Sequence, residues 1–332
     1  MKVLAIGDEH FEDKNELETS QMCDRIYQVV LEHKPDIIVS LGDALHQHST
    51  LHMGPFKRAI NFFHRLSQMC QHLYILVGNH DRPNNTAFLT DDSPFIACKV
   101  WDNTTVVDKV FTYKDLVFVP YVPPGRFMEA LNTVNINEEN ITDYKLVFAH
   151  QEFKGSKMGA ITSLNGDEYG PTWPLCVSGH IHEYQEPQHN LLYPGTPIQL
   201  SYGMPEAKGV LLLDTEDLEN RTFIDLGIAK KMIIHLTPEQ LATYNPPENC
   251  FIKIVCKGDT KVIREITKLE SVRIMLQSSR IKLSIQEERK KDNLPAILTK
   301  TETIPFQKRL FTAMNEQSDE VKELFKGIFG EY

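Results

Sequence analysis

Short apolar runs alternate with amphipathic segments along the first half of the chain. Residues 2–7, 37–39 and 73–77 are apolar and rich in β-branched side chains, as expected for strands that are covered on both faces. Between them, apolar residues recur at helical spacing over 19–33 and 56–66. The pattern predicts an α/β fold with a largely parallel sheet and helices outside it.

Each of these strands runs into a small residue and then into polar ones. Gly7-Asp8, Gly42-Asp43 and Gly78-Asn79 follow the three strands directly. Further short strands are expected at 105–107, 116–119, 146–149, 175–178 and 209–213, and two of these run into His150 and Gly179-His180. Ligands of such sheets gather beyond the carboxyl ends of the strands. Five loops are therefore expected to converge on one rim.

The pattern changes beyond about residue 230. Residues 251–256 and 281–285 are expected to be strands and 260–277 a helix between them, a compact β-α-β unit. We therefore predict a domain over 1–230, a smaller domain over 231–292 and a helical segment over 293–332. Two amphipathic helices are expected in this last segment, with apolar faces formed by Phe306, Leu310, Phe311 and Met314 and by Val321, Leu324, Phe325, Ile328 and Phe329. These faces either pack on the chain's own core or bind a helix of another protein.

Composition narrows the class of protein. With 41% hydrophobic and 24% charged residues among 332, the chain has the composition of an ordinary globular protein. No run of 18 apolar residues exists, and the six cysteines include no Cys-x-x-Cys pair, so we expect a cytoplasmic protein with reduced thiols and no membrane association. The net charge of -10 argues against indiscriminate nucleic-acid binding, but bound metal cations would invert the potential at a site.

Polar motifs behind the strands suggest a metal site. Asp8-x-His10 or a lone His150 is, by itself, more often a surface or hydrogen-bonded residue. The motifs gain weight because they occur together, each behind an apolar strand. Carboxylate, imidazole and amide ligands suit manganese, iron or zinc better than magnesium or calcium, and manganese is our first choice. We predict two divalent ions held by Asp8, His10, Asp43, Asn79, His150, His180 and His182.

Two such ions would suit hydrolysis at phosphorus. Ions roughly 3.5–4 Å apart can share one carboxylate and one water, lower the pKa of that water and stabilise an in-line displacement. Asp43 is the natural bridging ligand. His80, next to the ligand Asn79, is free to donate a proton to the leaving oxygen, and Asp81 is expected to orient His80. Glycines before the ligands serve sharp turns close to the ions.

At these motifs the sequence resembles the calcineurin-like metallophosphoesterase superfamily. The signature Asp-x-His, Gly-Asp, Gly-Asn-His-Asp, His and Gly-His-x-His is matched between residues 7 and 182. The resemblance implies a four-layer α/β/β/α core, in which helices flank a two-layered β-sandwich. It also implies one ion on Asp8, His10, Asp43 and His182 and a second ion on Asp43, Asn79, His150 and His180.

Within that superfamily, Gly42-Asp43-Ala44-Leu45-His46 resembles the motif of the SbcD-like DNA nucleases. This resemblance implies a small capping domain after the core, matched by 251–285, and C-terminal helices that dock on the coiled-coil base of an SbcC-like ATPase. It also implies a homodimer formed through helices near residues 50–100. The length is similar to that of the compact phage members, which would place the protein in a host cytoplasm.

Candidate substrate contacts lie outside the signature. His46 is placed to touch a substrate phosphate or the DNA backbone, with a solvated loop as the alternative, and Arg82 directly follows the signature. Tyr202 belongs to a segment that resembles the family's loop closing the site, where it could stack on a base or orient one. For His48 and His52 we expect a solvated loop.

Three functions are compatible with these residues. The leading hypothesis is a manganese-dependent DNA exonuclease and endonuclease subunit for recombination and repair, which hydrolyses phosphodiesters with a metal-bound hydroxide while an ATPase partner gives access to duplex DNA. The alternative is a stand-alone phosphoesterase acting on nucleotides, small phosphodiesters or phosphoproteins. The third is a scaffold without activity. Hydrolysis of single-stranded DNA but not of nucleotides would favour the first.

Overall fold

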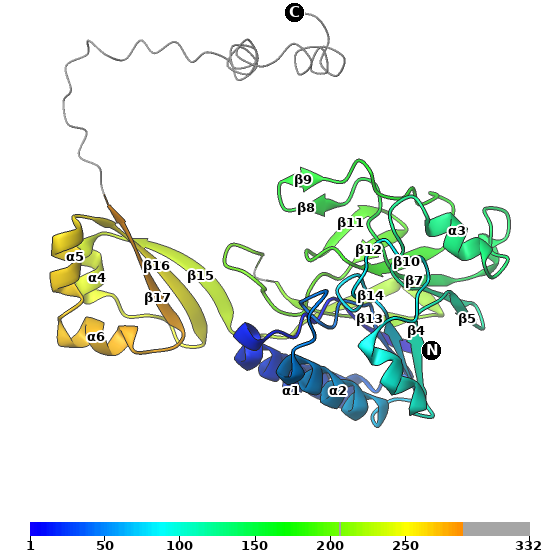
Figure 1. Cartoon of the computed structure of the whole chain (residues 1–332), viewed down its shortest axis with the longest axis horizontal. Coiled ribbons are helices and arrows are strands. Elements are labelled where there is room, and N and C mark those ends of the chain that lie inside the picture. The colour runs from blue at the N-terminus through cyan, green and yellow to red at the C-terminus, as the bar shows by residue number, and fades with distance from the viewer. Residues whose placement is uncertain (206, 288–332) are drawn as a thin grey trace, which may run out of the picture. The chain divides into compact units, whose positions relative to one another are not determined.

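Two six-stranded sheets form the core of the computed structural model, which describes residues 1–205 and 207–287 (Figure 1). The first sheet has the order β14 (Asp217–Asp225), β13 (Gly209–Asp214), β1 (Lys2–Ile6), β2 (Ile37–Ser40), β3 (His72–Leu76) and β4 (Thr104–Val107). The second has the order β11 (Gln185–Gln188), β12 (Leu191–Tyr193), β10 (Leu175–Gly179), β7 (Leu146–His150), β6 (Leu116–Val119) and β5 (Phe111–Tyr113).

Parallel strands occupy the centre of both sheets. β1 to β4 run parallel, as do β12, β10, β7 and β6. Antiparallel strands complete the edges, with β13 and β14 on the first sheet and β11 and β5 on the second. The sheets are therefore mixed rather than largely parallel. The parallel strands β1, β2 and β3 still have their carboxyl ends at one edge of the first sheet, and β7 and β10 have theirs at one edge of the second. Side chains that follow these strands can therefore lie close together.

Alternation along the strands separates the layers. In β1, Val3 and Ala5 pack in the core between the two sheets, whereas Leu4 and Ile6 pack in the core under the helices. Successive side chains of a strand point to opposite faces, so each central strand buries both of its faces. β7 does the same with Phe148 between the sheets and Val147 on the outer side. The predicted four-layer α/β/β/α core is confirmed.

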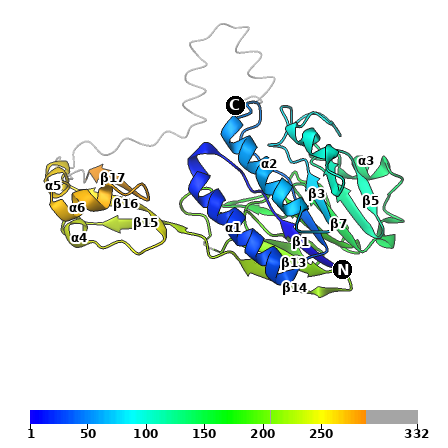
Figure 2. The same cartoon turned by 90° about the horizontal axis from the view of Figure 1, so that it is seen from below.

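Helices form the outer layers. α1 (Glu16–His33) and α2 (Met53–Ser67) lie side by side over the first sheet (Figure 2), and Met22, Ile26 and Phe63 join its core. α1 ends at His33, and the capping residue Lys34 adopts a left-handed conformation just before Pro35. α3 (Phe127–Asn132) lies on the second sheet, and short 3-10 helices are η1 (Asp13–Asn15), η2 (Pro94–Val100) and η3 (Ile141–Asp143).

A third sheet follows the two core sheets in the sequence. It has the order β15 (Lys230–Leu236), β16 (Cys250–Gly258) and β17 (Ile281–Glu287). Its helices are α4 (Pro238–Thr243), α5 (Thr260–Ile266) and α6 (Glu270–Leu276). Ile252, Ile254 and Cys256 point from β16 into a separate hydrophobic cluster with these helices.

Two details of this sheet differ from the prediction. The expected helix over 260–277 is broken, because Leu269 has an extended backbone (φ -59°, ψ 136°) that ends one helical segment and starts the next. β15 was not predicted, since Lys230, Lys231 and His235 interrupt its apolar pattern. Its partner is β16, to which it runs parallel.

Several expectations reach beyond the described residues. The two predicted C-terminal helices, with their apolar residues between Phe306 and Phe329, lie outside them. The domain limits at 230/231 and 292/293 stay predictions. Among the residues that the structure describes, no helix has the length and apolarity needed to cross a membrane.

Candidate metal centre

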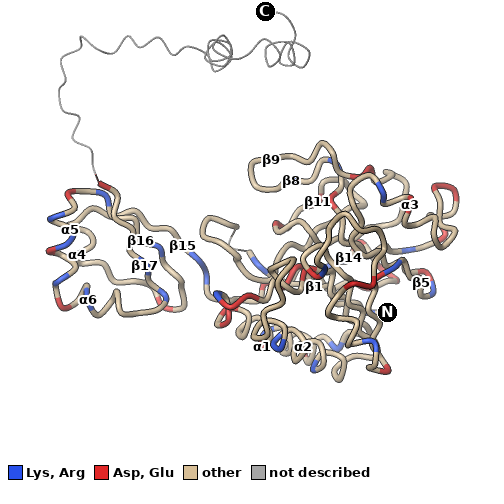
Figure 3. Tube along the Cα trace, viewed as in Figure 1, with Lys and Arg blue, Asp and Glu red and all other residues tan. Residues whose placement is uncertain are grey.

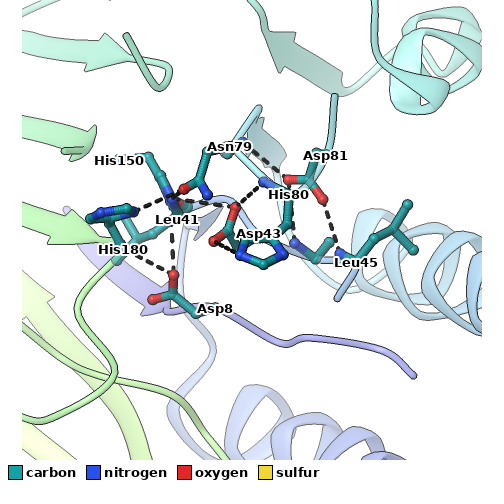
Figure 4. A network of polar contacts seen from close by, with 12 residues as sticks. Asp8, Leu41, Asp43, Leu45, Asn79, His80, Asp81, His150 and His180 are labelled. Carbon is teal, nitrogen blue, oxygen red and sulfur yellow. Dashed lines mark hydrogen bonds and ion pairs between the residues drawn. The ribbon is translucent and has the colours of Figure 1, made fainter. Parts of the chain in front are cut away.

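The loops after five strands bring the predicted metal ligands together (Figure 4). Asp8 and His10 follow β1, Asp43 follows β2, and Asn79 follows β3. The remaining three ligands come from the second sheet, at the ends of β7 and β10. Their donor atoms form two groups in which all atoms lie within 4.8 Å of one another, namely Asp8, His10 and His182, and Asp43, His150 and His180.

The first group combines two imidazoles and a carboxylate. The Nε2 atoms of His10 and His182 lie 3.0 Å apart. His10 Nδ1 lies 3.3 Å from the Leu45 carbonyl, so a proton on Nδ1 leaves the Nε2 lone pair free. Asp8 Oδ2 is buried and has no hydrogen-bond partner among the described residues. An orphaned carboxylate oxygen beside converging imidazoles fits a cation site.

The second group is organised around the Asn79 amide oxygen. Asn79 Oδ1 lies 2.8 Å from His180 Nδ1 and 3.0 Å from His150 Nε2. His150 Nδ1 lies 2.7 Å from the Leu41 carbonyl, which fixes the proton on Nδ1 and directs Nε2 towards Asn79 and Asp43. This mixture of amide oxygen and imidazole suits a borderline divalent ion.

Asp43 lies between the two groups. Its Oδ1 is 3.3 Å from His150 Nε2, and its Oδ2 is 4.0 Å from His10 Nε2. The backbone N–H of His80 donates to Oδ1 at 2.7 Å and holds the carboxylate in place. One oxygen therefore faces each group, as expected for a bridging carboxylate.

The backbone at the site adopts conformations that side chains rarely allow. Asp8, His10, Asp43 and His180 have positive φ angles of 30°, 48°, 54° and 82°. Each such residue costs about 1–3 kcal/mol and persists only where the surroundings enforce it. A Cβ on Gly78 would lie 2.2 Å from Asp43 Oδ1, so the close approach of β3 to the bridging ligand requires glycine there.

The pKa values of the buried ligands are shifted from their usual values. Burial raises the pKa of Asp8 to about 8 and lowers that of His182 to about 4. Burial also lowers the pKa of His10. For His150, burial favours the neutral form, but the Asp43 carboxylate outweighs it and raises the pKa to about 9, while His150 lowers the pKa of Asp43 against its burial. Without cations, the protein neutralises its buried charge with protons that a metal would displace.

His80 is placed for proton transfer. Its Nδ1 lies 2.5 Å from the His46 carbonyl, and its Nε2 lies 3.9 Å from Asp43 Oδ2. Because Nδ1 is engaged by the carbonyl, Nε2 is the ring nitrogen that faces the ligands. His80 also lines the cleft, where Nε2 could exchange a proton with a substrate oxygen. His48 stacks on the His80 ring with centroids 3.7 Å apart and lies 2.9 Å from the Asn79 carbonyl. His48 nevertheless lies in an exposed loop, as predicted, and contacts the site from there.

Asp81 does not orient His80 as predicted. Its carboxylate accepts backbone N–H groups from Ala44 at 3.3 Å, Leu45 at 2.9 Å and Gly78 at 3.0 Å. Asp81 therefore ties the turn after β3 to the loop that carries Asp43. The His80 ring instead has the His46 carbonyl, in the loop after β2, as its hydrogen-bond partner.

The three predicted substrate contacts have different surroundings. The side chain of His46 is 37% exposed and 3.9 Å from the Glu12 carboxylate, close enough to the site to meet a substrate. Arg82 is buried and its guanidinium lies 4.6 Å from the centroid of the Tyr121 ring. It therefore packs inside the protein and is not exposed to a substrate. Tyr202 is half-buried, and burial together with nearby Glu18 raises its pKa.

Three residues at the site were not singled out from the sequence. Tyr121 packs between Arg82 and His180, with its ring 5.9 Å from the imidazole. Lys208 is buried, and its Nζ donates to the His182 carbonyl at 2.8 Å. Glu152 lies 3.9 Å from His180 Nε2. Position after a predicted strand could have indicated Tyr121, but no local signal marks the other two.

A cleft of about 380 Å³ opens beside the ligands. Asp43, His80, His180 and His182 line one part of it. The other part is lined by Lys157, Met158, Gly159, Glu183, Ser201 and Met204. A phosphate held by the two ligand groups would extend into this cleft.

Known proteins that are similar to this chain are phosphoesterases. Residues 1–184 match the family of calcineurin-like phosphoesterases. The chain is 39% identical over 281 residues to "Putative phosphoesterase 244L" of Invertebrate iridescent virus 6, covering 80% of this chain and 97% of the relative. It is 42% identical over 250 residues to "Putative phosphoesterase 078R" of Invertebrate iridescent virus 3, covering 74% and 72%. A solved structure of the E. coli phosphoesterase Yfce matches with 15% identity and a TM-score of 0.35, over 68% of this chain and 94% of that one.

The fold and the ligand groups define a metal-dependent phosphoesterase. The chain belongs to the calcineurin-like phosphoesterase family. It is therefore a hydrolase of phosphoesters, and the two groups of side chains are where its divalent metals fit.

Proposed function

We propose that the chain is the nuclease subunit of an SbcCD-like recombination and repair complex. It would hydrolyse phosphodiesters of DNA, as exonuclease and endonuclease, with two manganese ions. The observation that carries this proposal is the arrangement around Asp43, which places one oxygen towards each ligand group while His80 lies beside it at the cleft. When bound, two cations would neutralise charge on the phosphoryl oxygens and lower the pKa of an attacking water.

The loop that resembles the nuclease motif contributes to this arrangement. The His46 carbonyl lies 2.5 Å from His80 Nδ1, and the His46 ring packs edge-on against His10. His46 thus helps fix the ring that would give a proton to the leaving oxygen. The motif that suggested a nuclease therefore has a structural role at the site, which supports the proposal.

Manganese is favoured by the donor atoms. Each group includes at least one carboxylate and two imidazoles, and Asn79 adds an amide oxygen. Magnesium and calcium prefer shells of oxygen alone, whereas manganese accepts both kinds of donor. Lys208 and the Leu41 and Leu45 carbonyls orient these donors from outside.

The proposed partners rest on other parts of the chain. An SbcC-like ATPase would bind the predicted C-terminal helices, and the β15–β17 unit with α4–α6 would be the capping domain. A homodimer near residues 50–100 is supported by the exposed side chains of Met53 (76%) and Val100 (79%). The free cysteines of the chain agree with a cytoplasmic location. Lys and Arg are interspersed with Asp and Glu along the described trace (Figure 3), so DNA binding would depend on the cleft and its cations.

A second candidate is a stand-alone phosphoesterase for nucleotides, small phosphodiesters or phosphoproteins. It is favoured by the names of the two viral relatives, which specify a phosphoesterase and nothing narrower. The cleft would then hold a small substrate, and the β15–β17 unit would shape its entrance or serve only as a packed appendage.

Hydrolysis by the purified chain separates the two candidates. Labelled single-stranded and linear duplex DNA, mononucleotides and bis(p-nitrophenyl) phosphate are incubated with manganese and wild-type protein, Asp43→Ala or the control Asp115→Ala, which changes a partly exposed carboxylate. DNA cleavage lost only in Asp43→Ala supports the nuclease. Hydrolysis of the small substrates without cleavage of DNA would transfer the proposal to the second candidate.

His80→Ser tests the proton donor separately. We expect cleavage to fall by about 10²–10⁴-fold while manganese binding, measured by titration calorimetry, stays at the wild-type level. Cleavage at the wild-type rate would refute the role of His80. A parallel loss of metal binding would mean that the ring is needed for the ligand loop rather than for proton transfer.

A further inference from the structure

A small β-hairpin stands at the cleft, outside the two core sheets. It consists of β8 (Lys157–Met158) and β9 (Ile161–Thr162), which form a two-stranded sheet of their own among the described residues (Figure 1). Gly159 begins the two-residue turn with φ +60°, the conformation for which such hairpin turns need glycine. A two-stranded ribbon is marginally stable alone, so this one needs support from its surroundings.

Side chains and backbone anchor the base of this β8–β9 hairpin. Gln185 accepts the Lys157 N–H at 2.7 Å and donates to the Lys157 carbonyl at 2.8 Å. Below the hairpin, the backbones of Ser156 and Ser163 are hydrogen-bonded at 2.8 Å, and Phe153 pairs with Asp167. The hairpin is thus held as a defined projection and is not a loose loop.

The hairpin and the residues next to it expose large apolar side chains to solvent. Met158 is 41% exposed and Ile161 67%, and Leu164 just beyond it is 76% exposed. Met158 and Ile161 are directly opposite each other in the register, so they share one face. Large apolar side chains gathered on such a small projection indicate a contact with another molecule.

That molecule is the substrate, because the hairpin and the metal ligands line the same cleft. Lys157, Met158 and Gly159 form part of the wall that Asp43 and His180 complete. The Lys157 side chain is exposed, and no ion pair engages its ammonium group within the described residues. The cleft wall therefore offers a cation and, beside it, an apolar face.

We propose that the β8–β9 hairpin binds the nucleotide next to the scissile phosphodiester of single-stranded DNA. This inference rests on the proposed nuclease function. A DNA strand carries an anionic phosphate and an apolar base face in each nucleotide, the pair of features that Lys157 and the Met158–Ile161 face complement. Lys157 contacts the neighbouring phosphate. Met158, with its polarisable sulfur, and Ile161 pack on the base.

The hairpin sets substrate size and leaves the chemistry unchanged. None of its residues belongs to the ligand groups, so hydrolysis of a small phosphodiester does not require them. A DNA strand gains the extra contacts only because it continues past the reacting phosphate. The hairpin therefore distinguishes a polynucleotide from a small ester, which is the distinction that separates the two candidate functions.

Kinetics with two substrates test the proposal. The variants are Lys157→Gln and the double variant Met158→Ser with Ile161→Ser. The controls are Lys268→Gln and Ile274→Ser, which change an exposed lysine between α5 and α6 and an exposed isoleucine on α6. With manganese, we expect KM for a single-stranded oligodeoxynucleotide to rise roughly five- to tenfold in each hairpin variant, with unchanged hydrolysis of bis(p-nitrophenyl) phosphate. Fluorescence anisotropy of the same oligonucleotide should show the same loss of affinity.

Each other outcome overturns a different statement. Wild-type KM and affinity for the oligonucleotide in both hairpin variants would remove the hairpin's role and leave the nuclease proposal standing. Equal losses on both substrates would show that the hairpin supports the site itself and is not a substrate contact. A wild-type protein that hydrolyses bis(p-nitrophenyl) phosphate but neither cuts nor binds the oligonucleotide would overturn the nuclease proposal and the DNA contact together, and a phosphopeptide would be the next probe.

Discussion

Asp81→Asn distinguishes a residue that ties two loops together from one that orients His80. Its carboxylate accepts backbone N–H groups from Ala44, Leu45 and Gly78. An Asn oxygen in the place of Oδ2 keeps the bonds from Ala44 and Gly78, but its NH2 group then faces the Leu45 N–H. One buried donor loses its acceptor, which costs about 1–3 kcal/mol.

A second effect opposes this loss in the metal-free protein. Burial, with a smaller contribution from the Asp43 charge, raises the pKa of Asp81 from 3.8 to about 6. At neutral pH the buried carboxylate is thus disfavoured by about 3 kcal/mol, and neutral Asn removes that penalty. The two effects are of similar size, so we expect Tm without metal to change by less than about 4 °C. With metal present, the loop carrying Asp43 is held less firmly, and affinity should fall about 10- to 100-fold.

Titration calorimetry with manganese and thermal unfolding with and without the ion measure both quantities. Asp115→Asn is the matched control, because that carboxylate is partly exposed and pairs with Lys145 at the surface. We expect Asp81→Asn to lose most of the stabilisation that manganese gives and Asp115→Asn to keep it. Wild-type manganese affinity in Asp81→Asn, with a reduced kcat, would refute this reasoning and restore the role of orienting His80.

Three further changes test the site. Lys208→Met should weaken manganese binding roughly tenfold by titration calorimetry, because a ligand loop loses its clamp, and Lys208→Arg should restore part of it; equal affinities would contradict this. Acidification should weaken manganese binding, since protons on Asp8 (pKa about 8) and His150 (pKa about 9) must leave first. Affinity should therefore rise up to about pH 9, by up to about tenfold per pH unit for each proton, and a flat profile would exclude this competition. Gly78→Ala places a Cβ 2.2 Å from a ligand oxygen, so metal binding and bis(p-nitrophenyl) phosphate hydrolysis should be lost, whereas Gly54→Ala in α2 should retain both.

The central strands could be predicted because both of their faces are buried. Apolar runs such as Val3–Ile6 need no alternation to be recognised, and the glycine behind each run marks its end. The antiparallel edge strands β14, β11 and β5 could not be recognised in this way. β14 carries Glu219 and Asn220 on exposed positions, and β11 contains Pro187, so only their pairing with buried neighbours makes them strands.

The same contrast applies to the site. Clustering of the ligands followed from strand order, because each ligand comes within a few residues of a strand end. The roles of Asp81 and Lys208 did not follow, since they depend on contacts with residues that are distant in sequence, such as Leu45 and His182. Burial of Arg82 against Tyr121 was equally invisible, because it requires the loops after β3 and β6 to meet.

The backbone is strained where the ligand loops meet. Asp8 and His180 have positive φ angles, and a Cβ on Gly78 would lie 2.2 Å from Asp43 Oδ1. Bound cations would satisfy the unpaired Asp8 oxygen and would displace the proton that the Asp43 carboxylate favours on His150. Metal binding should therefore stabilise both sheets at once, as one ligand group joins β1 to β10 and the other joins β2 to β7.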